Sequence, residues 1–185
     1  MPRGAMPGES CSRHEAWKGA QMIGKKVEAA FNQQINHEAG SAYLYLSASA
    51  YFQALGLEGM AHWMRVQAGE ERKHAFKFYD EIVDRSGRVE LLALGKPKME
   101  WKSPLDAFKD AYKHEVFITG KINDLMRLAE KEGDYAAAEF LHWFVNEQVE
   151  EEQQVVRIVQ MLERIGDSGG ALVMLDEELG ERKGE

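Results

Sequence analysis

Apolar residues recur every three or four positions along four long stretches of the chain. The stretches span residues 25 to 53, 58 to 86, 104 to 131 and 134 to 165. This period matches one face of an α-helix, so the pattern predicts four amphipathic helices. Leu172, Leu175 and Leu179 repeat the pattern over a shorter segment and predict a short fifth helix that needs packing to be stable. Glycines separate the stretches, at Gly56, Gly87, Gly133 and Gly166.

Residues 87 to 103 lie between the second and third predicted helices and show no periodicity. Extended at about 3.3 Å per residue, this segment reaches about 55 Å, whereas a helix of about 28 residues is about 42 Å long. Antiparallel neighbours would not need this reach, so we expect the segment to cross the full length of a four-helix bundle. The prolines favour the same all-α fold, because none interrupts a predicted helix. They are Pro2, Pro7, Pro97 and Pro104.

Residues 1 to 21 contain prolines and glycines but no apolar period. We therefore expect a disordered N-terminal extension, followed by one domain over residues 22 to 185. Cys11 and His14 lie in this extension, where two candidate ligands make a poor metal site. Since the chain has one cysteine, it forms no internal disulfide, and its apolar runs are too short for a signal peptide or a membrane span. These features favour the cytoplasm.

The net charge is −8, which disfavours nucleic acid and anionic membranes as partners and favours cations. Each long predicted helix carries a carboxylate on its apolar face. An ionised group removed from water costs several kcal/mol unless a counter-ion, a hydrogen-bond network or a metal compensates it. The four residues are Glu38, Glu71, Glu115 and Glu151. His74 follows Glu71 by one helical turn, and Gln148 lies beside Glu151.

The four glutamates are expected at nearly one height in the bundle. With a rise of about 1.5 Å per residue, they lie about 20 to 25 Å from one end. An up-down-up-down order without the crossover also leaves them near mid-height, so the spacing does not choose between the two topologies. Four such carboxylates would repel one another, and two divalent cations would neutralise them. Oxygen ligands with one imidazole suit iron or manganese. The competing interpretation is a set of protonated, mutually hydrogen-bonded core glutamates.

Several neighbouring residues have two interpretations. Tyr45, two turns after Glu38, is either a core tyrosine or a hydrogen-bonding or redox partner of the metals. Glu70, Glu147 and Glu150 form either a third cation site or a solvated acidic face. Glu139 and His142 repeat the Glu-x-x-His spacing, but His142 lies about half a turn around the helix from Glu151, so we expect no metal there. The remaining histidines, His37, His62 and His114, do not join the apolar faces.

Several motifs around these residues resemble those of the non-haem bacterial and archaeal ferritins, over about residues 25 to 182. The motifs are Asn36-His37-Glu38, Tyr43-Leu44-Tyr45-Leu46, Ala61-His62-Trp63-Met64, Glu70-Glu71-Arg72-Lys73-His74-Ala75, Lys113-His114-Glu115 and Trp143-Phe144-Val145-Asn146-Glu147-Gln148-Val149-Glu150-Glu151. The resemblance implies an iron-storage ferroxidase that oxidises Fe(II) with O2 or H2O2. It also implies a homo-oligomeric shell of 24 subunits around an Fe(III) mineral, without haem.

By this resemblance, Glu38, Glu71 and His74 hold the first iron. Glu71 bridges to a second iron, held by Glu115 and Glu151 with Gln148 close by. Glu70, Glu147, Glu150 and Glu151 match the acidic third site of many bacterial members. Tyr45 and Trp143 match redox-active aromatic residues, and the fifth helix would line a symmetry axis. The chain departs from the pattern at Gly40 and Gly69, which cost about 1 kcal/mol each within a helix, and in its longer N-terminal extension.

Three related functions fit the residues less well. A rubrerythrin-like peroxidase needs four cysteines and a second Glu-x-x-His, whereas this chain has one cysteine and Gln148-Val149-Glu150-Glu151. A bacterioferritin needs a methionine that holds haem between subunits, but Met60 and Met64 fall on the core face. A non-catalytic shell subunit should have lost metal ligands, and this chain retains them.

Overall fold

The computed structural model describes residues 22–166 and 168–184. These residues form five helices and no strand: α1 (Lys25–Ala54), α2 (Glu58–Asp84), α3 (Pro104–Glu132), α4 (Tyr135–Ile165) and α5 (Gly169–Gly180). The all-α fold and the short fifth helix are thus confirmed, with boundaries within two residues of the predicted ones for the four long helices. The predictions for residues 1 to 21, including Cys11 and His14, lie outside the described residues.

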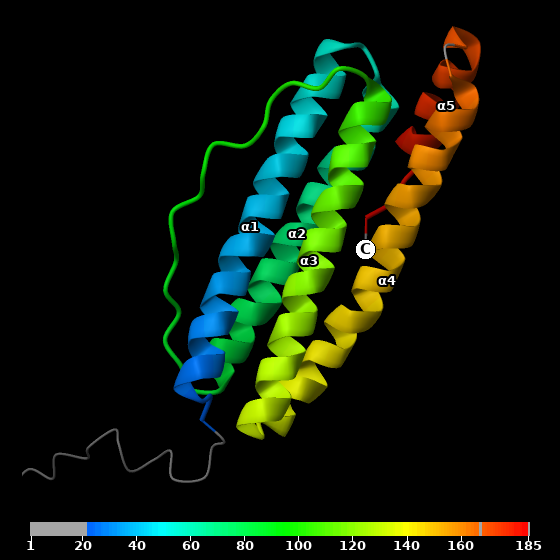
Figure 1. The fold of residues 1–185 in the computed structure, drawn as a ribbon. Coiled ribbons are helices and arrows are strands. Elements are labelled where there is room, and N and C mark those ends of the chain that lie inside the picture. Colours follow the sequence, from blue (N-terminus) through cyan, green and yellow to red (C-terminus); the bar gives the residue numbers. More distant parts are fainter. Residues whose placement is uncertain (1–21, 167, 185) are drawn as a thin grey trace, which may run out of the picture.

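The first four helices form a bundle with a long crossover (Figure 1). α1 and α2 pack as one antiparallel pair, and α3 and α4 as the other. Residues 87–103 contain no helix or strand, and they run along the outside of the bundle from the end of α2 to the opposite end, where α3 begins. The structure therefore has the predicted crossover, and α2 and α3 point the same way along the bundle.

The ends of the helices follow from local hydrogen bonding. Ser103 caps α3, because its Oγ accepts from the Asp106 N–H at 3.1 Å, and Pro104 takes the first helical position. α2 ends two residues before the predicted boundary. There Ser86 adopts a positive φ of 57°, and the Gly87 N–H donates to the Ile82 carbonyl at 2.8 Å. A left-handed residue of this kind closes the last turn of a helix.

Side chains of α1 hold the crossover in place. Asn32 donates from Nδ2 to the Arg88 carbonyl at 3.0 Å and accepts from the Glu90 N–H at 2.7 Å. Farther along, the Tyr51 hydroxyl donates to the Trp101 carbonyl at 3.0 Å. Because a segment without regular structure lacks the hydrogen bonds of a helix or sheet, such side chains supply its backbone partners.

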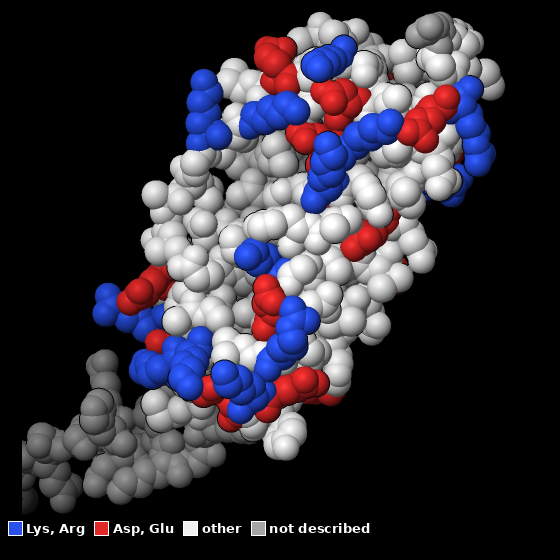
Figure 2. Space-filling view, in the orientation of Figure 1, with Lys and Arg blue, Asp and Glu red and all other residues white. Residues whose placement is uncertain are grey.

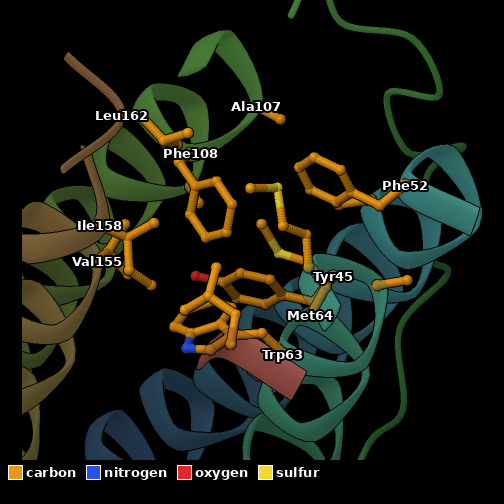
Figure 3. Close-up of a cluster of buried hydrophobic side chains, with 14 of the residues drawn as sticks. Tyr45, Phe52, Trp63, Met64, Ala107, Phe108, Val155, Ile158 and Leu162 are labelled. Carbon is orange, nitrogen blue, oxygen red and sulfur yellow. The ribbon is translucent and has the colours of Figure 1, made fainter. Parts of the chain in front are cut away.

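Two apolar clusters fill the bundle, and each long helix contributes to both. The first contains Tyr45, Phe52, Trp63, Met64, Phe108, Val155 and Leu162 among its members (Figure 3). The second contains Phe31, Phe78, Ile118, Ile122, Leu141 and Phe144 among others. In every long helix the glutamate of the apolar face falls between the residues of the two clusters. The four glutamates therefore form a polar layer between two apolar layers.

The apolar face predicted for the second half of the first helix is wrong in part. The sequence pattern puts Ala42, Leu46 and Ser49 to Ala50 on the face that Glu38 and Tyr45 share. Tyr45 is 1% exposed and Ser49 8%, but Leu46 is 48% exposed and Ala50 is also exposed. Residues 43 to 46 are all apolar or aromatic, so hydrophobicity alone does not fix which of them faces inward. Counting one turn at a time from Glu38 leads to Ser41, Tyr45, Ser49 and Phe52, which are all buried.

The surface seen in Figure 2 carries both signs of charge, interspersed, without a continuous patch of one sign. Among the described residues, no helix has the length and apolar character that crossing a membrane requires.

Candidate metal centre

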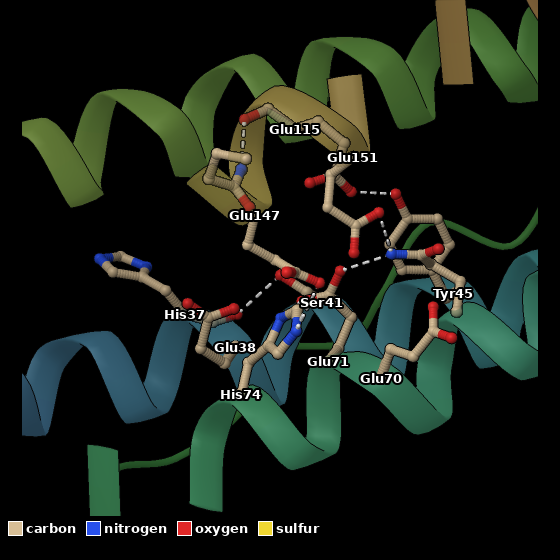
Figure 4. Close-up of polar contacts among 12 residues, drawn as sticks. His37, Glu38, Ser41, Tyr45, Glu70, Glu71, His74, Glu115, Glu147 and Glu151 are labelled. Carbon is tan, nitrogen blue, oxygen red and sulfur yellow. Dashed lines mark hydrogen bonds and ion pairs between the residues drawn. The ribbon is translucent and has the colours of Figure 1, made fainter. Parts of the chain in front are cut away.

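Four glutamates, one from each long helix, converge in the middle of the bundle (Figure 4). Their exposed fractions are 1% for Glu38, 2% for Glu71, 1% for Glu115 and 2% for Glu151. Glu38 and Glu71 come from the α1–α2 pair, and Glu115 and Glu151 from the facing α3–α4 pair. The convergence predicted from helix heights is therefore observed.

Glu38, Glu71 and His74 form the first group of potential ligands. One ligand atom from each lies within 4.8 Å of the others. His74 Nδ1 is 3.6 Å from Glu71 Oε2, as expected for residues separated by one helical turn. Two carboxylates and an imidazole at this separation are a donor set that a divalent iron or manganese ion accepts.

A second group contains His74, Glu147 and Glu151, again with one atom each within 4.8 Å of the others. The Nε2 atom of His74 is 3.8 Å from Glu147 Oε1. The two ring nitrogens of His74 thus face carboxylates of different helices, Glu71 on α2 and Glu147 on α4. Of the residues predicted as either a third cation site or an acidic face, Glu147 therefore lies beside the imidazole.

Glu115 belongs to neither group and is held by Tyr45. The Tyr45 hydroxyl donates to Glu115 Oε1 across the interface of α1 and α3. Burial and the charge of Glu115 raise the pKa of Tyr45 well above its ordinary value, so the phenol keeps its proton and remains a donor. Of the two interpretations of Tyr45, the structure thus supports a hydrogen-bonding partner within the centre.

Two glutamines that the sequence analysis did not single out orient these carboxylates. Gln34 donates from Nε2 to Glu38 Oε1 at 2.7 Å. Gln67 donates from Nε2 to Glu71 Oε1 at 3.2 Å and to Glu151 Oε2 at 2.8 Å, and so joins α2 to α4. Each glutamine precedes its glutamate by four residues. A glutamine one turn before a carboxylate on an apolar face is the signal that would have found both.

Gln148 is fixed by a chain of hydrogen bonds from α3 and α4. Its Nε2 donates to the Glu115 carbonyl at 3.3 Å and to Thr119 Oγ1 at 3.2 Å. Thr119 in turn donates its only hydroxyl proton to Glu152 Oε1 at 2.6 Å, so its oxygen can only accept from Gln148. The direction of these hydrogen bonds engages the amide nitrogen of Gln148. Its side-chain carbonyl oxygen is then the atom that would interact with a cation.

Burial is the largest influence on the carboxyl groups and favours their neutral forms. Together with the nearby charge of Glu71, it raises the pKa of Glu38 and of Glu115 well above the ordinary value and that of Glu151 to about 8. Burial would also raise the pKa of Glu71, but the contact with His74 holds it below the ordinary value. Burial would lower the pKa of His74, yet Glu147 and Glu71 raise it to about 11.

Some buried oxygens of this centre have no hydrogen-bond partner among the described residues. They are Glu38 Oε2, Glu115 Oε2 and Gln67 Oε1. Buried polar atoms are nearly always paired, so unpaired carboxylate oxygens in a protein interior indicate a ligand. The donors are hard oxygens plus one imidazole, without a thiolate, and they fit iron or manganese.

The other residues weighed as metal ligands belong to neither of these two groups. Glu150 is exposed, and Glu70 forms an ion pair with Arg182. Glu139 and His142 contact each other at 3.2 Å on the surface, with side chains 85% and 63% exposed. Hence only one of the two Glu-x-x-His motifs faces the bundle interior, as predicted.

A four-helix bundle with a long crossover and carboxylates from all four helices defines the class of ferritin-like proteins. The family model described as a ferritin-like domain matches residues 28–165, and the chain belongs to this family. The bacterial non-heme ferritin of Staphylococcus aureus (strain NCTC 8325 / PS 47) is 39% identical over 161 residues, which cover 87% of this chain and 97% of that protein. That of Staphylococcus haemolyticus (strain JCSC1435) is 40% identical over the same length and coverage.

Solved structures agree with these sequence relatives. An open pore ferritin from the hyperthermophilic archaeon Archaeoglobus fulgidus is 48% identical, and its structure superimposes with a TM-score of 0.86. The match covers 87% of this chain and 99% of that chain. An engineered closed form of the same archaeal ferritin matches with a TM-score of 0.87 at 48% identity. The resemblance inferred from the motifs is thereby confirmed.

Proposed function

We propose that this protein is an iron-storage ferroxidase. It binds two Fe(II) ions as substrates in the bundle interior, oxidises them with O2 or H2O2, and stores the Fe(III) as a mineral inside an oligomeric shell. The observation that carries the proposal is the convergence of four buried glutamates from four helices, with carboxylate oxygens that have no partner among the described residues. Membership of the ferritin-like family supports it.

The residues divide between two cation positions. Glu38, Glu71 and His74 would hold the first ion, and their ligand atoms already lie within 4.8 Å of one another. Glu71 would bridge to the second ion, held by Glu115 and Glu151 with the carbonyl oxygen of Gln148. Tyr45 and Gln67 would orient the carboxylates through their hydrogen bonds. Such outer partners usually change metal affinity about 10- to 100-fold when removed.

The chemistry follows from the donor set. Anionic oxygens stabilise Fe(III) more than Fe(II), and therefore favour the loss of an electron from each bound ion. Two Fe(II) ions together supply the two electrons that reduce O2 to H2O2, or H2O2 to water. Since the pKa of Glu151 is raised to about 8, the arrival of the cations also displaces protons from the carboxyl groups.

We further propose a cytoplasmic homo-oligomer, with a shell of 24 subunits. The α1–α2 pair carries exposed apolar side chains that a subunit contact would cover, among them Tyr43, Leu46 and Phe76. The solved relatives include an open pore form and an engineered closed form from one archaeon. Close relatives of this chain can thus differ in their pores while they keep the same subunit fold.

Anaerobic titration with Fe(II) tests the proposed function. We expect two tight sites per subunit in the wild type, and loss of at least one site together with most of the oxidation rate in Glu71→Ala. Glu139→Ala is the matched control, because it removes the glutamate of the exposed Glu-x-x-His motif. Fewer than two tight sites in the wild type, or a full oxidation rate in Glu71→Ala, would contradict the proposal.

A further inference from the structure

The chain end returns to the metal centre after α5. Figure 1 shows the C-terminal residues running back beside α4 towards the middle of the bundle. There Arg182 Nη2 lies 2.5 Å from Oε2 of Glu70, the residue that precedes Glu71 on α2. The two side chains are only 12% and 10% exposed, so this ion pair is shielded from water.

Further contacts hold Arg182 in this position. Its guanidinium lies over the ring of Trp63, 4.3 Å from the centroid, where the face of the indole attracts a cation. The Arg182 carbonyl lies 2.8 Å from Nε2 of His62. Both partners belong to α2, as Glu70 does. Three contacts to one helix therefore fix the arginine, and they hold the C-terminal segment beside Glu70.

The charge of Arg182 lies directly against one of the predicted ligands, Glu70. An arginine side chain carries a permanent positive charge. Glu70, which the resemblance placed in a third metal site, is thus neutralised by a permanent cation that the chain supplies.

We propose that Arg182 occupies with its own guanidinium the position of a third cation, and so restricts the centre to two metal ions. A metal ion at Glu70 would have to displace Arg182 and would lose a carboxylate already paired at 2.5 Å. Arg182 is then a specificity-determining residue that sets how many cations the carboxylates accept. This inference rests on the proposed function, since it concerns the same centre.

Two substitutions separate the charge of Arg182 from its packing. Arg182→Met removes the charge but keeps an unbranched apolar side chain over Trp63. Arg182→Lys keeps the charge. Arg157→Met is the matched control, because Arg157 pairs with Glu178 of α5 at 3.6 Å while its side chain is 73% exposed. It thus removes a cation near α5 that does not contact Glu70.

Calorimetric titration of the metal-free oligomer with Zn²⁺, which is not oxidised, counts the sites. We expect two per subunit in the wild type, Arg182→Lys and Arg157→Met. We expect a third site in Arg182→Met, which the wild type does not show at the same Zn²⁺ concentrations. The double variant Glu70→Gln/Arg182→Met should return to two sites. Circular dichroism and particle mass confirm that each variant is folded and assembled.

Two sites in both the wild type and Arg182→Met would overturn the role of Arg182 and leave the proposed function intact. Three sites in the wild type, with the third lost in Glu70→Gln, would overturn it as well. Fewer than two sites in the wild type would instead contradict the proposed function.

Discussion

Individual carboxylates of this protein owe their orientation to neighbours on the same helix and on the facing one. Gln34 and Gln67 each donate to the glutamate four residues later. Tyr45 reaches Glu115 on another helix. A buried carboxylate in a fixed rotamer needs little reorganisation when a cation arrives, so under the proposed function these neighbours would prepare the centre for binding.

Substitution of Thr119, which would not touch the cations, tests whether such neighbours position the ligand side chains. Thr119→Val removes the acceptor of the Gln148 amide proton and the donor to Glu152. We expect the affinity for the second cation to fall about 10- to 100-fold, with the first site, at Glu38 and His74, unchanged. Zn²⁺ calorimetry measures both sites. Thr119→Ser keeps the hydroxyl and should bind like the wild type; an equal loss at both sites in Thr119→Val would refute the positioning role.

At the scale of elements, α5 is attached to the bundle through the N-terminus of α2. Asp176 Oδ2 accepts from the Gly59 N–H at 3.1 Å, and its Oδ1 accepts from the Met60 N–H at 2.8 Å. Leu57, the N-cap residue of α2, offers no side-chain cap. A carboxylate from α5 thus satisfies the free donors and the dipole at the start of α2. This contact also sets where the chain end with Arg182 can lie.

Two glycines of α2 should respond to alanine in opposite ways. A Cβ at Gly59 would lie 1.6 Å from the Asp176 carbonyl oxygen, whereas a Cβ at Gly69 meets nothing within 4 Å. We expect Gly59→Ala to detach α5 and Gly69→Ala to stabilise the bundle by about 0.5–1 kcal/mol. Hydrogen exchange of residues 169–180 reports the first effect, and urea unfolding the second. Unchanged exchange in Gly59→Ala would show that α5 is not held by this close packing.

Asp110 ties the crossover to α3 and gives the fold a pH-dependent contact. Its Oδ2 accepts from Lys98 Nζ and from Trp101 Nε1, each at 3.0 Å. Burial would raise the pKa of Asp110, but these two donors bring it below the ordinary value. A lowered carboxyl pKa stabilises the fold above the unfolded pKa of about 3.9, and this stability is lost as the pH falls through the folded value.

Asp110→Asn should therefore lower the free energy of unfolding at pH 7, by about 0.5–1 kcal/mol for a partly exposed pair. The difference from the wild type should shrink below about pH 4. Urea denaturation between pH 7 and pH 3 measures it. Asp124→Asn, which alters an exposed pair with Arg127, should leave the stability unchanged. A difference that persists at pH 3 would mean that the charge of Asp110 is not its cause.

The helices and the crossover show how much of the fold the hydrophobic pattern of the sequence predicts. The four long helices and the crossover follow from hydrophobic period, glycine and proline positions, and segment length. The exposure of Leu46 did not follow, because Tyr43, Leu44, Tyr45 and Leu46 offer apolar side chains on every face. Tyr45 packs against Trp63 of α2 and donates to Glu115 of α3, and Leu46 is left on the surface.

In the whole molecule, the layer of four buried glutamates should lower the stability of the fold, and bound cations should offset this loss. Three buried carboxyls have a raised pKa without metal, which means that their ionised forms are disfavoured in the fold. A ligand that binds only the folded protein raises the free energy of unfolding by about 2.7 kcal/mol at a concentration 100 times its dissociation constant. The stability of the bundle should therefore depend on its metal content.

Removal of metal should accordingly lower the melting temperature by several degrees. Scanning calorimetry of the protein after chelation, and again after addition of Zn²⁺, measures the change. We expect the increase on adding Zn²⁺ to be largely absent in Glu38→Ala and full in His142→Ala, where the altered residue belongs to the exposed motif. An equal increase in both variants would place the stabilising ions outside the bundle interior.

The sequence by itself determined the five helices, the crossover and the four glutamates at one level. These follow from it because helical period and rise are local properties, which place each residue on a face and at a height without knowledge of its neighbours. Only the tertiary structure decided which groups meet there. Gln67 reaches Glu151 over 84 residues of chain, and Arg182 reaches Glu70 over 112. Such contacts depend on how the helices rotate about their axes and where the chain end returns, and no local pattern encodes either.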